Sequence, residues 1–126
     1  MSDGYTEINY LVSTNEDWRD GFLIEEAAAP VDLTGSSFIA HIRETENTLS
    51  IVLAASTDNG LLEIAPDQGD TGSETTGVVS WNVPETTMRL IEPGEYVWDI
   101  VWIDADGNQD MIAAGSVEIK RGITRT

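Results

Sequence analysis

The sequence contains no cysteine, a single histidine and only six lysine and arginine residues among its 126 positions. The absence of cysteine excludes disulfides, thiolate metal sites and cysteine nucleophiles. The lone histidine, His41, leaves almost no material for a zinc site or a Ser–His–Asp triad. No apolar run approaches the roughly 18 residues that a membrane-spanning helix needs. The chain therefore lacks most of the side chains from which catalytic and metal centres are built.

Positive charge is scarce because 23 Asp and Glu residues face six Lys and Arg residues, giving a formal net charge of −17. Binding to nucleic acid depends on Lys and Arg neutralising phosphates, so long-range repulsion predicts no nucleic-acid partner. An anionic membrane surface is disfavoured for the same reason. Like-charge repulsion also opposes unspecific self-association. The composition suits a partner that is basic.

Short apolar alternations separated by turn residues dominate the pattern. Phe38, Ala40 and Ile42 are expected on one face of a strand, with Ile39, His41 and Arg43 on the other. About eight or nine such stretches recur at spacings near ten residues, which is typical of an antiparallel sandwich. The prediction is an all-β fold, an immunoglobulin-like antiparallel β-sandwich with little helix. Chain length favours a single domain over residues 1–126, with a short N-terminal arm (1–15) and a basic C-terminal tail (120–126).

Residue types along the chain predict individual secondary-structure elements. One short helical turn is expected over residues 84–90, because proline suits the first turn of a helix. Residues 95–103 are apolar at almost every position, which predicts a central strand covered on both faces. Further expectations are a loop at 27–30, a strand at 48–55, a loop at 65–77 and a hairpin turn at 104–108.

Three segments together resemble a known family. They are Pro30-Val31-Asp32-Leu33-Thr34-Gly35, Glu92-Pro93-Gly94-Glu95-Tyr96, and Asp104-Ala105-Asp106-Gly107 leading to Gly115-Ser116-Val117. Their order and spacing resemble the small β-sandwich virion proteins of tailed phages, similar to the N-terminal domain of baseplate upper proteins, over roughly residues 16–125. The resemblance implies structural positions only: a tight turn at Gly35, a chain reversal at Gly94 and a closed hairpin at Gly107.

The family resemblance implies a structural virion protein without enzymatic activity or cofactors. We expect an assembly or adaptor subunit of the tail, baseplate or neck, present in repeated copies and joined to other phage virion proteins or fibres. Because the chain stops at Thr126, where baseplate relatives continue, a stand-alone subunit is expected. A capsid decoration subunit is an alternative. A carbohydrate-binding module, reading glycans through aromatic side chains, is an alternative of another class.

Candidate interface residues lie mainly near the two termini. Tyr5, Ile8 and Tyr10 belong to an alternating stretch that could add to a sheet edge of this domain or of a neighbour. Lys120, Arg121 and Arg125 are half of all basic residues and could dock onto an acidic neighbour, or form an ordinary solvated strand end. Trp18 lies among charged residues and is the expected exposed interface anchor. Trp81, Trp98 and Trp102 are expected in the core.

Two remaining patterns favour ordinary structure over chemistry. Residues Asp104, Asp106, Asn108 and Asp110 are spaced like the start of a calcium loop, but Gln109 occupies the position that requires glycine. A plain hairpin is the better prediction. Acidic pairs suited to a glycosidase arise by chance among so many carboxylates. We therefore predict no catalytic, cofactor-binding or metal-ligating residue.

Overall fold

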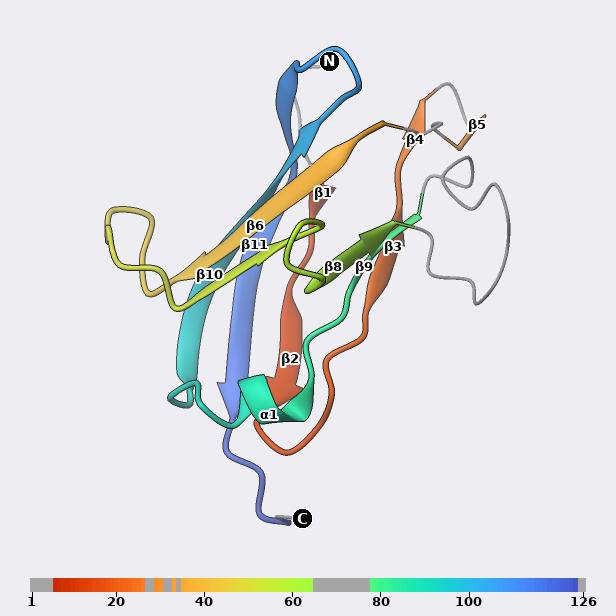
Figure 1. Ribbon diagram of the computed structural model, residues 1–126. Coiled ribbons are helices and arrows are strands. Elements are labelled where there is room, and N and C mark those ends of the chain that lie inside the picture. Colours follow the sequence, from red (N-terminus) through yellow and green to blue (C-terminus); the bar gives the residue numbers. More distant parts are fainter. Residues whose placement is uncertain (1–5, 27–28, 31–32, 34, 65–77, 125–126) are drawn as a thin grey trace.

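The computed structural model describes residues 6–26, 29–30, 33, 35–64 and 78–124. Within them the chain forms eleven strands and one helix of four residues (Figure 1). The strands are β1 (Thr6–Glu7), β2 (Tyr10–Ser13), β3 (Gly21–Leu23), β4 (Glu25–Glu26), β5 (Ala29–Pro30), β6 (Ser37–Arg43), β7 (Leu53–Ser56), β8 (Leu62–Ile64), β9 (Val78–Trp81), β10 (Gly94–Ile103) and β11 (Gln109–Lys120), and the helix is α1 (Glu85–Met88).

The main sheet has six strands in the order β1-β11-β10-β6-β7, with β2 also paired to β11. Strands β10 and β11 are the longest and run antiparallel through its middle (Figure 1). The N-terminal strands β1 and β2 both run parallel to β11 along its other side. This arrangement places two stretches of the predicted N-terminal arm, Thr6–Glu7 and Tyr10–Ser13, in the chain's own sheet.

A second sheet of three strands, in the order β3-β9-β8, forms the other layer. The bridge between Trp18 and Val83 continues the β3–β9 pairing toward α1. A small ribbon of β4 and β5 completes the described strands. The inner faces follow the alternation of the sequence, since Phe38, Ala40 and Ile42 are all fully buried.

A cluster of aromatic rings fills the space between the two sheets. The rings of Trp18 and Trp81 stack with centroids 4.1 Å apart, and Trp98 meets Trp81 edge-on at 5.5 Å. Tyr10 packs edge-on against Trp18 at 5.1 Å. Immunoglobulin domains of antibodies join their sheets here with a disulfide. In this cysteine-free chain, stacked and edge-to-face rings supply the inter-sheet contact instead.

The start of β10 carries the tyrosine corner that is a hallmark of immunoglobulin-like sandwiches. Tyr96 enters the core, and its hydroxyl donates a hydrogen bond to the carbonyl oxygen of Glu92, four residues upstream. The topology and this corner confirm the predicted immunoglobulin-like all-β sandwich. The chain reversal expected at Gly94 is not found. Gly94 does not have a positive φ angle, and it is already the first residue of strand β10.

Of the other local predictions, some are confirmed and others are wrong in part. The helical turn after Pro84 is confirmed as α1, and the hairpin turn closes with Gly107 at φ +90°. The expected strand at 48–55 is wrong in its first half: β7 begins only at Leu53, after a loop held by Arg43. The predicted loop at 27–30 is partly wrong, because Ala29–Pro30 pairs with β4, while residues 27–28 lie outside the described part. The predicted loop at 65–77 also lies outside it.

More strands are present than the predicted eight or nine, because several are only two or three residues long. Periodicity cannot register an isolated strand of two residues, so β4 and β5 are invisible to it. The predicted alternating stretch through Ile8 and Tyr10 is divided into β1 and β2. Strand β10 is central, as expected, but its two faces differ. Tyr96, Trp98 and Ile100 are buried toward the second sheet, whereas Val97, Asp99 and Val101 are only half-buried on the outer face.

Candidate interaction surfaces

The outer face of the main sheet presents a row of side chains that crosses four strands. Glu7 of β1 pairs with Ala114 of β11, and Ala114 pairs with Asp99 of β10. Asp99 in turn lies opposite His41 of β6. Because paired residues on neighbouring strands point to the same face, these four side chains form one line across the sheet. We call it the Glu7–His41 row.

A hollow of about 820 Å³ lies over this row. The apolar residues Val97, Ala114 and Met111 line it. Three carboxylates, from Glu7, Glu46 and Asp99, line it together with the side chains of His41 and Arg43, Asn9, Thr45 and Ser116. The lining therefore combines apolar side chains with an excess of acidic over basic groups.

The guanidinium of Arg43 is engaged within the chain. Its Nη1 donates to the carbonyl oxygens of Thr48 at 2.8 Å and Leu49 at 3.3 Å. Its Nη2 lies 3.3 Å from Nδ1 of His41. The ion pairs among the described residues involve Asp17, Glu85 and Glu118, so none of them includes a carboxylate of the hollow.

A second row, immediately adjacent, is apolar. Val101 of β10 pairs with Met111 of β11 on one side and with Ile39 of β6 on the other. Ile39 is 40 % exposed and Met111 is 39 % exposed. We call this line the Met111–Ile39 row. The Met111–Ile39 row is thus a partly exposed apolar line, one row away from the acidic side chains of the hollow.

The expected exposure of Trp18 is wrong. Its side chain is only 2 % exposed, stacks on Trp81 and donates from Nε1 to Asp20 at 2.9 Å. The charged neighbours in the sequence face solvent, while the bridge to Val83 turns Trp18 into the space between the sheets. Trp18 is therefore a core residue and no interface anchor.

Ile8 and Tyr10 belong to the chain's own sheet. Ile8 donates its backbone N–H to Ala114 O at 2.9 Å, and Tyr10 pairs with Val117. Both side chains are half-buried against the core. Burial raises the pKa of Tyr10 to about 12, and the charge of Asp20 adds to the effect. Tyr5 lies outside the described residues.

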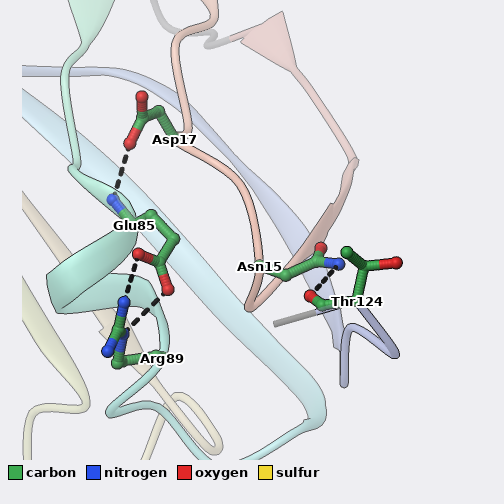
Figure 2. Close-up of polar contacts among 5 residues, drawn as sticks. All are labelled: Asn15, Asp17, Glu85, Arg89 and Thr124. Carbon is green, nitrogen blue, oxygen red and sulfur yellow. Dashed lines mark hydrogen bonds and ion pairs between the residues drawn. The ribbon is translucent and has the colours of Figure 1, made fainter. Parts of the chain in front are cut away.

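Figure 2 shows how the C-terminal segment lies beside the β2–β3 connection of the same chain. Nδ2 of Asn15 donates to Thr124 O at 2.9 Å. The backbone N–H of Gly122 donates to Oγ1 of Thr14 at 3.0 Å. A methyl group at Gly122 would lie only 2.1 Å from Cγ of Asn15, so the close approach requires glycine. The backbone of the tail is thus docked on its own domain as far as Thr124.

The three basic residues of the tail that were predicted as interface candidates differ in their surroundings. Nζ of Lys120 lies 4.0 Å from Glu118, an exposed pair on the same strand. Arg121 is exposed. Arg125 lies outside the described residues. Docking of these charges onto a neighbouring subunit stays a prediction.

The same end of the molecule shows a polar cap for α1. The carboxylate of Asp17 accepts a hydrogen bond from Glu85 N at 2.7 Å, and the Glu85 carboxylate pairs with Arg89 (Figure 2). A negative charge at a helix N-terminus satisfies an otherwise free N–H. These contacts fix the short helix and are structural.

The hairpin with calcium-like spacing is held by its own carboxylate. Asp104 accepts hydrogen bonds from the backbone N–H groups of Asp106 and Asn108, both at 2.9 Å. These bonds, chiefly that from Asn108, lower the pKa of Asp104. Among the described residues no group of three His, Asp or Glu side chains is placed to share a metal ion.

Sequence reasoning missed the residues of the hollow, Glu7, Asp99 and Ala114. Each is unremarkable in its own segment, and only strand order and register bring them into one row. The alternation along residues 95–103 does place Asp99 on the outer face, but nothing in it places Glu7 beside it. No described helix is both long and apolar enough to cross a bilayer.

Comparisons with known proteins give only weak structural similarities. No family model matches the sequence, and no curated protein matches it. Among solved structures, CopC from Methylosinus trichosporium OB3b is similar, with a TM-score of 0.44, 11% identity, and coverage of 97% of this chain and 89% of that chain.

Two further structures show the same level of similarity. The PKD domain of human KIAA0319 has a TM-score of 0.39 at 12% identity, covering 100% of this chain and 95% of that chain. Murine CRIg has a TM-score of 0.35 at 10% identity, covering 92% of each chain. Similarities of this size carry no information about the activity of this chain.

Proposed function

We propose that this chain is a structural assembly protein without catalytic activity, an adaptor subunit of the tail, baseplate or neck of a tailed bacteriophage. In this role it occupies repeated positions on the virion and joins other virion proteins or fibres. The single observation that carries the assembly role is the outer face of the main sheet, where the acidic hollow adjoins the exposed Met111–Ile39 row. The phage setting rests on the resemblance of the turn motifs.

Those motifs occupy positions that serve the fold. Gly35 has φ +79° in the turn closed by Ser36 N and Leu33 O, and Gly107 has φ +90° in the β10–β11 hairpin. The Pro-Gly-Xaa-Tyr motif ends in the tyrosine corner of Tyr96. Motifs with structural roles are what a scaffold protein needs, and they suit an adaptor better than an enzyme.

The absence of catalysis is part of the proposal. Among the described residues, the hydrogen-bond contact of the His41 ring is with Arg43, and no hydroxyl nucleophile is paired to it. An activated nucleophile requires a base within hydrogen-bond reach that is itself oriented by a third group. The His41–Arg43 arrangement meets neither condition.

The two alternatives differ in how well the described surface suits them. A capsid decoration subunit would use the same outer face and differs only in its place on the particle. A carbohydrate-binding module needs exposed aromatic rings. Trp18, Trp81 and Trp98 are at most 3 % exposed, and Tyr10 and Trp102 are half-buried. The described surface therefore favours assembly over glycan stacking.

Mass spectrometry of purified particles, followed by cryo-electron microscopy, tests the proposal. The chain is expected in stoichiometric amounts, at repeated positions in the tail, baseplate or neck. Density on the capsid lattice would select the decoration subunit. Absence of the chain from particles would refute the virion role.

A further inference from the structure

We infer that the hollow over Ala114 is a docking site for a lysine or arginine side chain carried by an extended segment of a partner protein. The inference rests on the proposed assembly function and specifies the chemistry of its contact. It follows from the side chains that the sheet register brings together.

The first argument is the spacing of the two carboxylates. Glu7 and Asp99 flank Ala114 on the two strands next to β11. Because neighbouring strands lie about 4.8 Å apart, their Cα atoms are separated by roughly 10 Å across the small alanine side chain. The space above the methyl group is thus bounded on both sides by negative charge. A single cationic head group fits between two such carboxylates.

The second argument is the apolar lining of the same hollow. Val97 lies two residues before Asp99 on β10, and Met111 stands beside the hollow on β11. Lysine and arginine carry a charged head on an aliphatic stem that buries against apolar surface. Methionine adapts its shape to such a stem because its side chain is unbranched and flexible. The lining therefore suits the whole side chain and not only its charge.

The third argument is that Arg43, the basic residue that lines the hollow, is held by other groups and forms no ion pair with the Glu7 or Asp99 carboxylate, although it keeps its positive charge. Arg43 donates to the Thr48 and Leu49 carbonyl oxygens and contacts His41. The described ion pairs leave Glu7 and Asp99 without a partner of opposite charge. With a net charge of −17, the chain attracts a basic segment from a distance. Electrostatic complementarity of this kind sets both partner choice and orientation.

The register also predicts the pattern of the partner segment. Asp99 of the Glu7–His41 row and Val101 of the Met111–Ile39 row are two residues apart on β10. Two residues of an extended chain span roughly 7 Å. A segment lying along β10 thus places a lysine over Ala114 and, two positions away, an aliphatic side chain on the apolar row. The matching pattern is Lys/Arg, any residue, aliphatic.

A pentapeptide probe tests the inference on the full chain. The peptide Ac-Thr-Lys-Thr-Val-Thr-NH₂ is titrated into the ¹⁵N-labelled protein, and amide shifts are mapped by NMR. Shifts are expected at Glu7, Ala114, Asp99 and Val101, and the peptide with glutamate in place of lysine is expected to give none. Shifts confined to another face, or an equal response to the glutamate peptide, would overturn the inference.

Matched double variants distinguish binding at the hollow from a general effect of the chain's negative charge. Glu7→Gln with Asp99→Asn is expected to weaken binding at least tenfold. The control is Glu95→Gln with Glu118→Gln, a cross-strand pair that removes the same charge outside the hollow lining. It is expected to change binding less than twofold, and an equal loss in both pairs would refute the site. Ala114→Leu places a larger side chain between Glu7 and Asp99 and is expected to weaken binding without any charge change.

Two readouts keep this inference distinct from the proposed function. If the chain is present in particles but the lysine peptide does not bind, the docking site is refuted and the virion role stands. If the peptide binds as expected but the chain is absent from particles, the virion role is refuted and the docking site stands. Self-association of the wild-type chain that Glu7→Gln with Asp99→Asn abolishes, seen by sedimentation, would overturn the basic partner in favour of a second copy.

Discussion

The indole Nε1 of Trp98 donates a hydrogen bond of 2.9 Å to the backbone carbonyl oxygen of Ile8. Trp98 lies on β10 and Ile8 lies in the link between β1 and β2, with β11 between them. Strands β1 and β2 keep one register on β11, since Thr6 pairs with Ala113 and Tyr10 with Val117. They are therefore one strand interrupted at Ile8 and Asn9. At the interruption, Oδ1 of Asn9 accepts the hydrogen bond of Ser116 N, and Ile8 O turns to Trp98.

Gly115 makes this interruption possible, and its substitution is expected to detach the N-terminal strand. A Cβ at this position would lie 1.9 Å from Ile8 O. Gly115→Ala is expected to cost about 3 kcal/mol or more, measured by urea unfolding, because backbone would have to move. Hydrogen exchange at residues 6–13 is expected to rise.

Gly60→Ala is the control for this clash. Gly60 has φ +80° but nothing within 4 Å of its added Cβ, so only the conformational strain of about 1 kcal/mol is expected. Equal losses of stability in the two variants would contradict the steric role of Gly115.

Trp18 is expected to contribute to the free energy of unfolding and to make no contact with a binding partner. Trp18→Ala removes a fully buried ring and its stack on Trp81, and is expected to cost about 3–5 kcal/mol in thermal or urea unfolding. Trp18→Phe keeps an aromatic ring and is expected to lose less. A Trp18→Ala variant with unchanged stability would show that the ring is exposed.

The hydrogen bond of the tyrosine corner is expected to contribute modestly to the free energy of unfolding. Tyr96→Phe deletes only the hydroxyl that bonds to Glu92 O, so a loss of about 1 kcal/mol is expected. Because the hydroxyl is close to the surface, water can replace part of the bond. Differential scanning calorimetry of both proteins measures the difference, and a loss above about 3 kcal/mol would imply disruption of the ring packing as well.

Stability is expected to fall at high pH through Tyr10. Burial raises the pKa of Tyr10 to about 12 from the ordinary tyrosine value of 10.0. The folded state thus holds the proton more tightly, so the stabilisation is complete below pH 10 and decreases as pH rises from about 10 to 12. The decrease is expected to be about 1–2 kcal/mol, since the half-buried hydroxyl is screened by solvent.

Tyr10→Phe removes this titration and serves as the control. Its free energy of unfolding is expected to change less than that of the wild type over the same pH range. Parallel curves for the two proteins would exclude Tyr10 as the source of the pH dependence.

The sequence predicts what depends on local period and turn chemistry. Alternation at Phe38, Ala40 and Ile42 gives the inner face correctly, and the Asp-Gly turn at Gly107 gives the hairpin. Trp18 escapes prediction because its polar neighbours suggest exposure, while a single long-range bridge to Val83 decides its burial. Glu7 and Asp99 escape for a related reason. Their proximity depends on a parallel pairing between strands about a hundred residues apart, which no local pattern encodes.

Glu16 has a consequence for how molecules of this chain meet. Its Oε1 accepts a hydrogen bond of 3.2 Å from the backbone N–H of Ser13, on the strand at the border of the main sheet. Alternate amides of β2 point away from β11, as the bonds of Ile8 N and Thr14 N to β11 imply. A foreign strand would have to displace a carboxylate before it could extend the sheet there. This carboxylate therefore protects the β2 border against fibril-like growth at the position of Ser13.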